Sequence, residues 1–142
     1  MSDSKSKTTA IVDTMMSKDY FSQWLGIELI NADKGHCSLR MTVRQEMLNG
    51  FSIAHGGICY ALADSALAFA SNSHGSKCVS IETSVSHTAS VKKGDVLTAV
   101  AEEINYGEKV ALYYVTIINQ EAKKVALFKG TVYRTAKEWD IK

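Results

Sequence analysis

One carboxylate stands inside a stretch that is otherwise almost entirely apolar. Asp64 lies within residues 58–70, and its neighbours three and four positions away on a helix are Tyr60, Ala61, Leu67 and Ala68. The same helix therefore offers no basic partner, and a buried carboxylate is costly unless it is hydrogen-bonded or paired from elsewhere. Because perturbed carboxylates gather at active sites, Asp64 is a candidate catalytic residue. The alternative is an aspartate at the edge of the buried stripe that reaches solvent.

The helix expected from this stretch begins at the sequence Ala54-His55-Gly56-Gly57, just before residue 58. Paired glycines let a ligand approach the backbone closely, and the first N–H groups of a helix are unpaired donors. Such an end stabilises a phosphate, or the oxyanion that forms when a carbonyl is attacked. A glycine pair is equally explained by a turn into the helix, so this motif gains weight only together with Asp64.

The spacing of these two features constrains how they can act together. Gly57 and Asp64 lie two helical turns apart, about 10 Å along the axis, whereas a catalytic carboxylate must come within about 3 Å of the reacting atoms. One helix can hardly supply both groups to one reacting carbon. Two antiparallel helices across a dimer axis can, so the sequence predicts a homodimer whose active site is shared between subunits and occurs twice.

The rest of the chain predicts the elements that position this helix. The 142 residues suit a single domain, expected over residues 10–142 after a solvated, flexible tail at residues 1–9. A first amphipathic helix is expected from Ala10 to Gly26, and the apolar stretch 58–70 is typical of a buried helix. Alternating apolar and polar residues indicate strands at 36–44, 79–87, 96–106, 110–119 and 125–135. Short turns between the last four favour an antiparallel meander, which makes the fold class α+β.

Composition and charge exclude several classes of function. Hydrophobic residues make up 46% and charged residues 22%, with a formal net charge of +1, so no global field attracts nucleic acid or an anionic membrane. No apolar run approaches the roughly 20 residues that span a bilayer, and the polar amino terminus is unlike a secretory signal. The three cysteines have no C-x-x-C spacing and favour a reducing, cytoplasmic location with free thiols.

Several short motifs together resemble a known family. Met47-Leu48-Asn49-Gly50, His55-Gly56-Gly57 and Leu62-Ala63-Asp64-Ser65-Ala66 are similar to the signature of PaaI-type hotdog-fold acyl-CoA thioesterases. The likeness is closest to the thioesterases of bacterial phenylacetic acid degradation, and it covers most of residues 20–135. Further matches are Asn72-Ser73, Gly94-Asp95, Asn119-Gln120 and Val125-Ala126-Leu127-Phe128.

The resemblance implies a hotdog fold, in which an antiparallel sheet wraps a long central helix and subunits pair as dimers, often as dimers of dimers. It also implies hydrolysis of a small, aromatic acyl-CoA, of the phenylacetyl or hydroxyphenylacetyl type, to free acid and CoA without a metal or redox cofactor. On matching positions, Asp64 is the general base or the nucleophile, and the Gly56 N–H polarises the thioester carbonyl. Asn49 orients the carbonyl or the water, and His55 shapes the same loop.

Other residues are expected to bind the substrate. Gly57 completes the glycine pair at the helix start, and Ser80 matches a hydroxyl that assists the water in some relatives. Lys93, Gly107 and Lys109 lie in loops that contact CoA in relatives, where lysines can meet its phosphates. Ordinary solvated turn lysines explain these positions equally well.

Two other functions stay open. A hotdog-fold enoyl-CoA hydratase or dehydratase would place a histidine with an acid in the site, a role that His55 keeps available. A non-catalytic acyl-CoA binding module would use the same pocket without turnover. An α/β-hydrolase is excluded because the G-x-S-x-G elbow is absent. The remaining histidines, His36, His74 and His87, show no metal-ligand spacing with one another.

Overall fold

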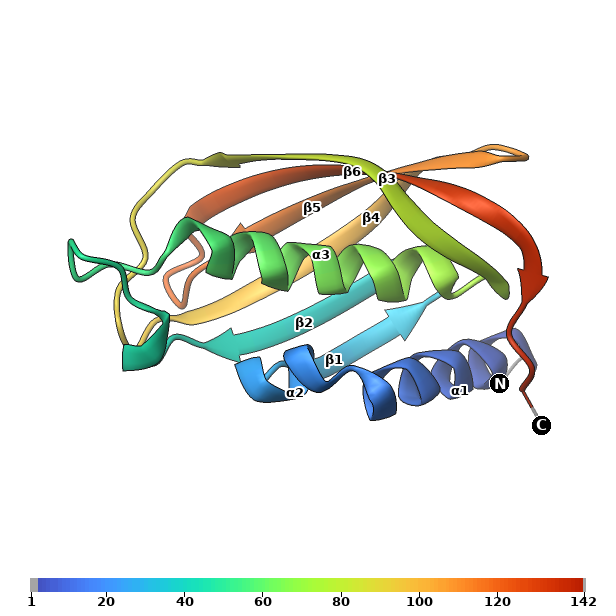
Figure 1. Cartoon of the computed structure of the whole chain (residues 1–142), viewed down its shortest axis with the longest axis horizontal. Coiled ribbons are helices and arrows are strands. Elements are labelled where there is room, and N and C mark those ends of the chain that lie inside the picture. The colour runs from blue at the N-terminus through green and yellow to red at the C-terminus, as the bar shows by residue number, and fades with distance from the viewer. Residues whose placement is uncertain (1–2, 142) are drawn as a thin grey trace.

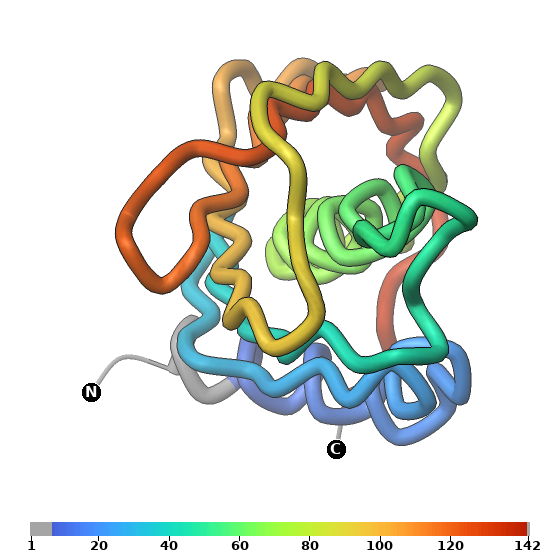
Figure 2. The backbone as a smooth tube through the Cα atoms, turned by 90° about the vertical axis from the view of Figure 1, so that its left-hand side faces the viewer, coloured from blue at the N-terminus to red at the C-terminus, as the bar shows by residue number. Residues whose placement is uncertain are grey.

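The computed structural model describes residues 3–141, with side chains from residue 7 onward. Its elements are α1 (Asp3–Lys18), α2 (Tyr20–Leu25), β1 (Glu28–Asp33), β2 (His36–Thr42), the short 3-10 helix η1 (Gln45–Met47), α3 (Gly56–Asn72), β3 (Ser76–His87), β4 (Val96–Tyr106), β5 (Val110–Ile118) and β6 (Lys124–Glu138). The six strands form one antiparallel sheet in the order β1-β2-β4-β5-β6-β3. The sheet curls around α3 (Figures 1 and 2). The expected α+β class and hotdog arrangement are confirmed.

The central helix α3 is buried because it is apolar on almost every face. Its buried residues are Cys59, Leu62, Ala63, Ser65, Ala66, Leu67, Phe69, Ala70, Ser71 and Asn72. Small side chains on α3 let the helix come close to the sheet. At one position the sheet residue facing the helix must also lack a side chain. A Cβ built on Gly130 of β6 would lie only 2.5 Å from Leu67 Cδ2. This contact fixes the height of α3 above the strands, and with it the positions of the groups that α3 carries.

The sheet differs from the predicted meander in two ways. β1 was not expected, because only Ala32 among residues 28–33 is buried and the pairing with β2 shifts register between Leu29 and Asn31. These features hide the alternation that marks a half-buried strand. β3 lies beside β6 at a sheet edge and not beside β4, whereas β4, β5 and β6 do form the predicted meander. The connection from β3 to β4 therefore crosses past the start of α3 (Figure 2).

The first helix begins within the segment that was expected to form a solvated tail. Residues 3–9 form the first part of α1, while residues 1 and 2 lie outside the described residues. Thr8 is buried, and its Oγ1 donates a 3.0 Å hydrogen bond to the carbonyl of Ser73, just after α3. This contact anchors the start of the chain to the core. Between residues 3 and 141, no helix combines the length and apolarity needed to cross a membrane.

The expected first helix is divided into α1 and α2 by Asp19. The Asp19 carboxylate caps α2 by accepting the Ser22 N–H at 3.0 Å, and α2 ends as predicted at Gly26, which adopts a left-handed conformation. The hydroxyls of Ser22 and Ser65 are 2.8 Å apart. This bond fastens α2 to α3 at the residue next to Asp64.

We expect Gly130→Ala to destabilise the fold by about 1–3 kcal/mol, the range measured for overpacked cores. The added methyl would overlap Leu67 and would also lie 3.1 Å from the Phe128 ring. Urea unfolding followed by circular dichroism measures the change. Gly50→Ala is the matched control, because a Cβ there meets nothing within 4 Å. Equal stability of the two variants would contradict a close approach of α3 to β6.

Candidate active site

The start of α3 leaves one backbone N–H free. His55 is the residue that precedes the helix, and its Nδ1 accepts the Gly57 N–H at 3.0 Å. The His55 carbonyl accepts the Ile58 N–H at 2.8 Å. In the part of the chain that the structure describes, the Gly56 N–H has no hydrogen-bond acceptor. The amino end of α3, which carries a partial positive charge, therefore presents the Gly56 amide as its available donor.

Asn49 organises the loop in front of this helix end. Its Oδ1 accepts the N–H groups of Phe51 at 2.8 Å and Ile53 at 3.4 Å, and its backbone N–H donates to the Ile53 carbonyl at 2.8 Å. The Ala54 N–H then donates to the carbonyl of Val91 at 2.7 Å, which joins the loop to the β3–β4 connection. Because Oδ1 holds the turn, the Nδ2 amide is the part of Asn49 that is left to contact a ligand.

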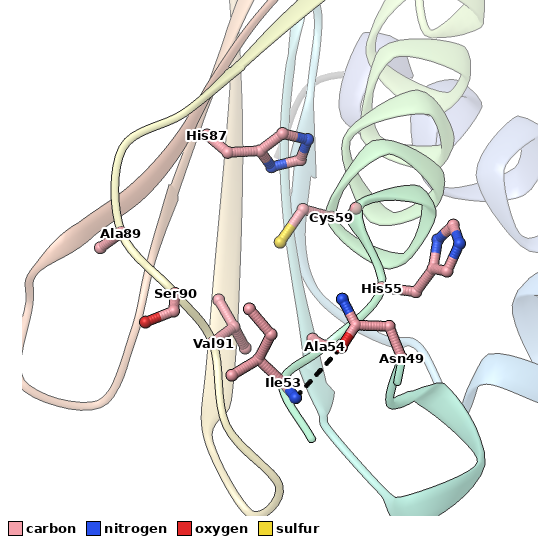
Figure 3. A pocket seen from close by; sticks show the side chains of 10 residues that line it. Asn49, Ile53, Ala54, His55, Cys59, His87, Ala89, Ser90 and Val91 are labelled. Atoms are coloured by element: carbon pink, nitrogen blue, oxygen red, sulfur yellow. Dashed lines mark hydrogen bonds between the residues drawn. The ribbon is translucent and has the colours of Figure 1, made fainter. Parts of the chain in front are cut away.

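A cavity of about 300 Å³ opens at this helix end (Figure 3). It is lined by Asn49, Ile53, Ala54, His55, Gly56, Cys59, His87, Ala89, Ser90 and Val91. Most of its wall is apolar, and burial raises the pKa of the Cys59 thiol to about 11, so this thiol is neutral at physiological pH. In Figure 3 the His55 ring points away from the cavity, whereas the His87 ring points toward the start of α3. A polar acyl carbonyl entering the cavity would meet the Gly56 amide.

His87 is the residue of this cavity that the sequence analysis passed over. It shows no metal-ligand spacing with the other histidines, and it is the last residue of β3. A Cβ built on Gly56 would lie 3.2 Å from His87 Nε2, so the imidazole lies directly beside the glycine backbone. The alternation of β3 was the available signal: Val85 packs against the core, so His87, two positions later, faces the same side.

Asp64 lies farther along α3, in a separate and smaller cavity of about 70 Å³. This second cavity is lined by Asp64, Leu67, Ala68, Ser71, Cys78, Ser80 and Val132. Burial raises the pKa of the Asp64 carboxyl, and the negative charge of Asp19 raises it further. A raised pKa makes the carboxylate a better proton acceptor. Ser80 and Asp64 line this same cavity, and the role of Ser80 in assisting the water stays a prediction.

Within one chain, the two halves of the predicted site do not meet. No residue lines both cavities, and Gly56 and Asp64 are eight residues apart on one helix, about 12 Å at 1.5 Å per residue. Asn49, His55, Gly56 and Gly57 are grouped at one end of α3, while Asp64 and Ser80 lie toward its middle. The prediction of a shared site used the similar separation of Gly57 from Asp64, seven residues or about 10 Å along the helix axis.

The residues expected to contact CoA lie at two different ends of the molecule. Lys93 is in the β3–β4 connection at the Gly56 end, where its Nζ donates to Gln45 Oε1 at 3.3 Å. Gly107 and Lys109 form the β4–β5 turn, where their carbonyls accept hydrogen bonds from Arg134. Neither of these two residues lines the cavity at Gly56 or the one at Asp64. Their roles in substrate binding stay predictions.

No cluster of three or more His, Cys, Asp or Glu side chains suited to a metal ion occurs among the described residues. Both cavities are lined mainly by apolar groups, and their polar side chains are amides, hydroxyls, the imidazoles of His55 and His87, the thiols of Cys59 and Cys78, and the Asp64 carboxyl. The expectation that the reaction needs no metal or redox cofactor stays a prediction.

Comparison with known proteins identifies the family. Residues 51–126 match the model of the thioesterase superfamily. A putative esterase of Archaeoglobus fulgidus is 37% identical over 129 residues, covering 91% of this chain and 84% of the relative. The acyl-coenzyme A thioesterase PaaI of Escherichia coli is 38% identical over 120 residues, covering 84% and 86%.

Solved structures agree with this assignment. The E. coli PaaI structure superposes with a TM-score of 0.92 at 35% identity, covering 94% of this chain and 97% of that one. A hypothetical thioesterase of Streptococcus pneumoniae, solved with coenzyme A, gives a TM-score of 0.77 at 27% identity, covering 80% and 88%. Two further structures of that protein carry an aspartate-to-alanine and a threonine-to-alanine mutation, sixteen positions apart. The chain belongs to the thioesterase superfamily, is of the PaaI type, and is a thioester hydrolase.

Proposed function

We propose that this protein hydrolyses small acyl-CoA thioesters at an active site built from two copies of the chain. The observation that carries the proposal is the unpaired Gly56 N–H at the mouth of an apolar cavity, on the same helix as a partly buried carboxylate about 12 Å away. Coenzyme A in the S. pneumoniae structure and the acyl-CoA activity named for E. coli PaaI support the substrate class.

In the proposed reaction the thioester carbonyl accepts the Gly56 N–H, and Asp64 of the other subunit acts on the carbonyl carbon. As a general base, Asp64 removes a proton from water, whose oxygen bonds to the carbonyl carbon. The oxyanion is stabilised at the helix end, and its collapse breaks the C–S bond and releases the CoA thiolate, which takes up the proton. As a nucleophile, Asp64 would first bond to the carbonyl carbon and expel the CoA thiolate, which gives an acyl-enzyme anhydride; water then hydrolyses the anhydride to the free acid and the Asp64 carboxylate.

The neighbouring side chains have supporting roles in this proposal. Asn49 orients the carbonyl or the water through its Nδ2 amide, because its Oδ1 holds the loop. His55 keeps the Gly57 N–H occupied and so shapes the helix start. Ser80, which lines the cavity of Asp64, would hold the attacking water. The sixteen positions between Asp64 and Ser80 equal the spacing of the two residues mutated in the S. pneumoniae protein.

A second copy of the chain would cover the exposed side of α3. Along this helix the less buried positions recur every three or four residues: Gly57, Tyr60, Ala61, Asp64 and Ala68. β3 is a free sheet edge and exposes Val79 and Ile81 by 55% and 57%. Exposed edges and apolar patches favour association, so a two-fold dimer would place Asp64 of one chain near Gly56 of the other. Pairing of such dimers into a tetramer is a further prediction.

The cavity at Gly56 is the proposed acyl site. Its volume of about 300 Å³ and its apolar lining suit a small acyl group, including an aromatic one of the phenylacetyl or hydroxyphenylacetyl type. A hydratase or dehydratase is less well supported, because the Nδ1 of His55 is occupied by the Gly57 N–H and its ring points out of the cavity (Figure 3). The expected cytoplasmic location rests on the free thiols of all three cysteines.

An acyl-CoA panel that includes phenylacetyl- and hydroxyphenylacetyl-CoA, followed by released thiol, tests the activity. We expect hydrolysis by the wild type and a loss of kcat of at least about 1,000-fold in Asp64→Asn, which removes the proton acceptor. Asp13→Asn, an exposed aspartate on α1, is the control and should keep wild-type activity. Full activity in Asp64→Asn would contradict the assignment of Asp64. Hydration of an enoyl-CoA without thiol release would favour the hydratase. Tight acyl-CoA binding without turnover would favour the binding module.

Gly56→Pro tests the backbone donor. Proline lacks the N–H but is well tolerated at the first position of a helix, and His55 has the extended backbone, with φ −59° and ψ 139°, that a following proline requires. We therefore expect a folded protein whose kcat is lowered on the order of 100-fold.

Gly56→Ala is the matched control, because it adds a Cβ at the same position but keeps the N–H. Circular dichroism should show both variants folded, and thiol release should separate them. Equal activity in the proline and alanine variants would contradict a role for the Gly56 amide.

A further inference from the structure

We propose that His87 supplies a second hydrogen bond to the thioester carbonyl oxygen, beside the one from the Gly56 N–H. This inference rests on the proposed function, because it concerns the substrate atom that binds at Gly56. It makes His87 a catalytic residue of the same half of the site, contributed by the strand that ends next to the helix start.

The position of the imidazole carries the argument. A Cβ built on Gly56 would lie 3.2 Å from His87 Nε2 and 3.6 Å from Cε1, so the ring edge faces the glycine from the cavity side. Figure 3 shows the ring extending from the end of β3 toward the start of α3. Because Gly56 and His87 line the same cavity, a single substrate oxygen bound there can approach both groups.

The backbone on both sides of His87 is held firmly. His87 pairs with Ala126 of β6, and the next residue, Thr88, donates its N–H to the Val125 carbonyl at 3.0 Å and its hydroxyl to the Lys124 carbonyl at 2.8 Å. A donor on a fixed backbone needs little reorganisation when charge develops on the substrate, which is the condition for electrostatic stabilisation of a transition state.

The ring is also free to donate. No group within residues 7–141 forms a hydrogen bond with the His87 side chain. A neutral imidazole with its proton on Nε2, or an imidazolium, can donate from this atom. Apart from two imidazoles, the Asn49 amide and the Ser90 hydroxyl, the side chains around the cavity are apolar or carry a neutral thiol, so few protein groups compete with the His87 ring for a substrate oxygen.

The helix end itself cannot provide the second donor. Oxyanion sites commonly combine two donors, and the next amide along α3 would be the natural partner of Gly56. That amide, the Gly57 N–H, is already donated to His55 Nδ1 at 3.0 Å. The Ile58 N–H is donated to the His55 carbonyl. His87 thus takes the place of the Gly57 N–H, which is occupied by its hydrogen bond to His55.

Two substitutions distinguish a His87 that donates a hydrogen bond from a His87 that only lines the cavity. His87→Phe keeps an aromatic ring without the N–H, and we expect kcat to fall on the order of 100-fold with KM changed less than about threefold. His87→Gln keeps an amide N–H near the position of Nε2, so it should retain activity within about tenfold of the wild type. His36→Phe, the same change at an exposed position at the start of β2, is the control and should leave kcat and KM unchanged.

The stretching frequency of the bound carbonyl provides a readout that a structural role would not move. In the Asp64→Asn background, a ¹³C-labelled acyl-CoA should show a lowered C=O frequency, and His87→Phe, but not His87→Gln, should raise it toward the value in water. Unchanged kcat and frequency in His87→Phe, equal losses in both His87 variants, or a change in KM alone would overturn the proposal. Failure of the wild type to hydrolyse any acyl-CoA would instead reject the proposed function, because the His87 comparison requires an active parent.

Discussion

The helix α3 carries both groups that the proposed thioester hydrolysis uses, and it holds them too far apart to serve one carbonyl carbon. The free Gly56 amide begins α3 and Asp64 lies eight residues later, about 12 Å away. No rotation of the Asp64 side chain closes this gap, and α3 cannot bend toward its own start while it is packed inside the sheet. The proposed two-fold assembly follows from this constraint, because only another copy of α3 can bring the second group.

The surrounding structure mainly holds α3 in place and leaves one N–H of its first turn, that of Gly56, available to a ligand. Gly130 and the alanines of α3 allow close contact with the sheet, while Asn49 braces the preceding loop. His55 occupies the Gly57 amide, which leaves Gly56 as the exposed backbone donor. The crossing from β3 to β4 then forms one wall of the cavity proposed to hold the acyl group, and His87, at the end of β3, also lines it. The strand order, with β3 beside β6, thus determines which side chains line this cavity.

Local patterns in the sequence predicted what depends on local physics. The apolar run around Asp64 predicted α3 because alanine favours helices and a helix that is apolar on all faces must be buried, and β4, β5 and β6 followed from alternation. β1 was not predicted, because its residues are mostly exposed and show no alternation. The position of β3 beside β6 depends on long-range strand pairing that no single segment encodes. For the same reason, the place of His87 in the cavity was not predicted. Gly107 and Lys109 matched relatives in sequence but lie in a turn away from both cavities.

Mixed dimers of two inactive variants test the shared site most directly. Co-expression of differently tagged Asp64→Asn and Gly56→Pro chains, followed by purification through both tags, yields dimers with one complete pair of groups across the two-fold axis. We expect such dimers to recover about half of the wild-type thioesterase activity, because one of two equivalent sites is intact. Mixed dimers no more active than either parent, or a wild type that is monomeric and fully active, would contradict the shared site.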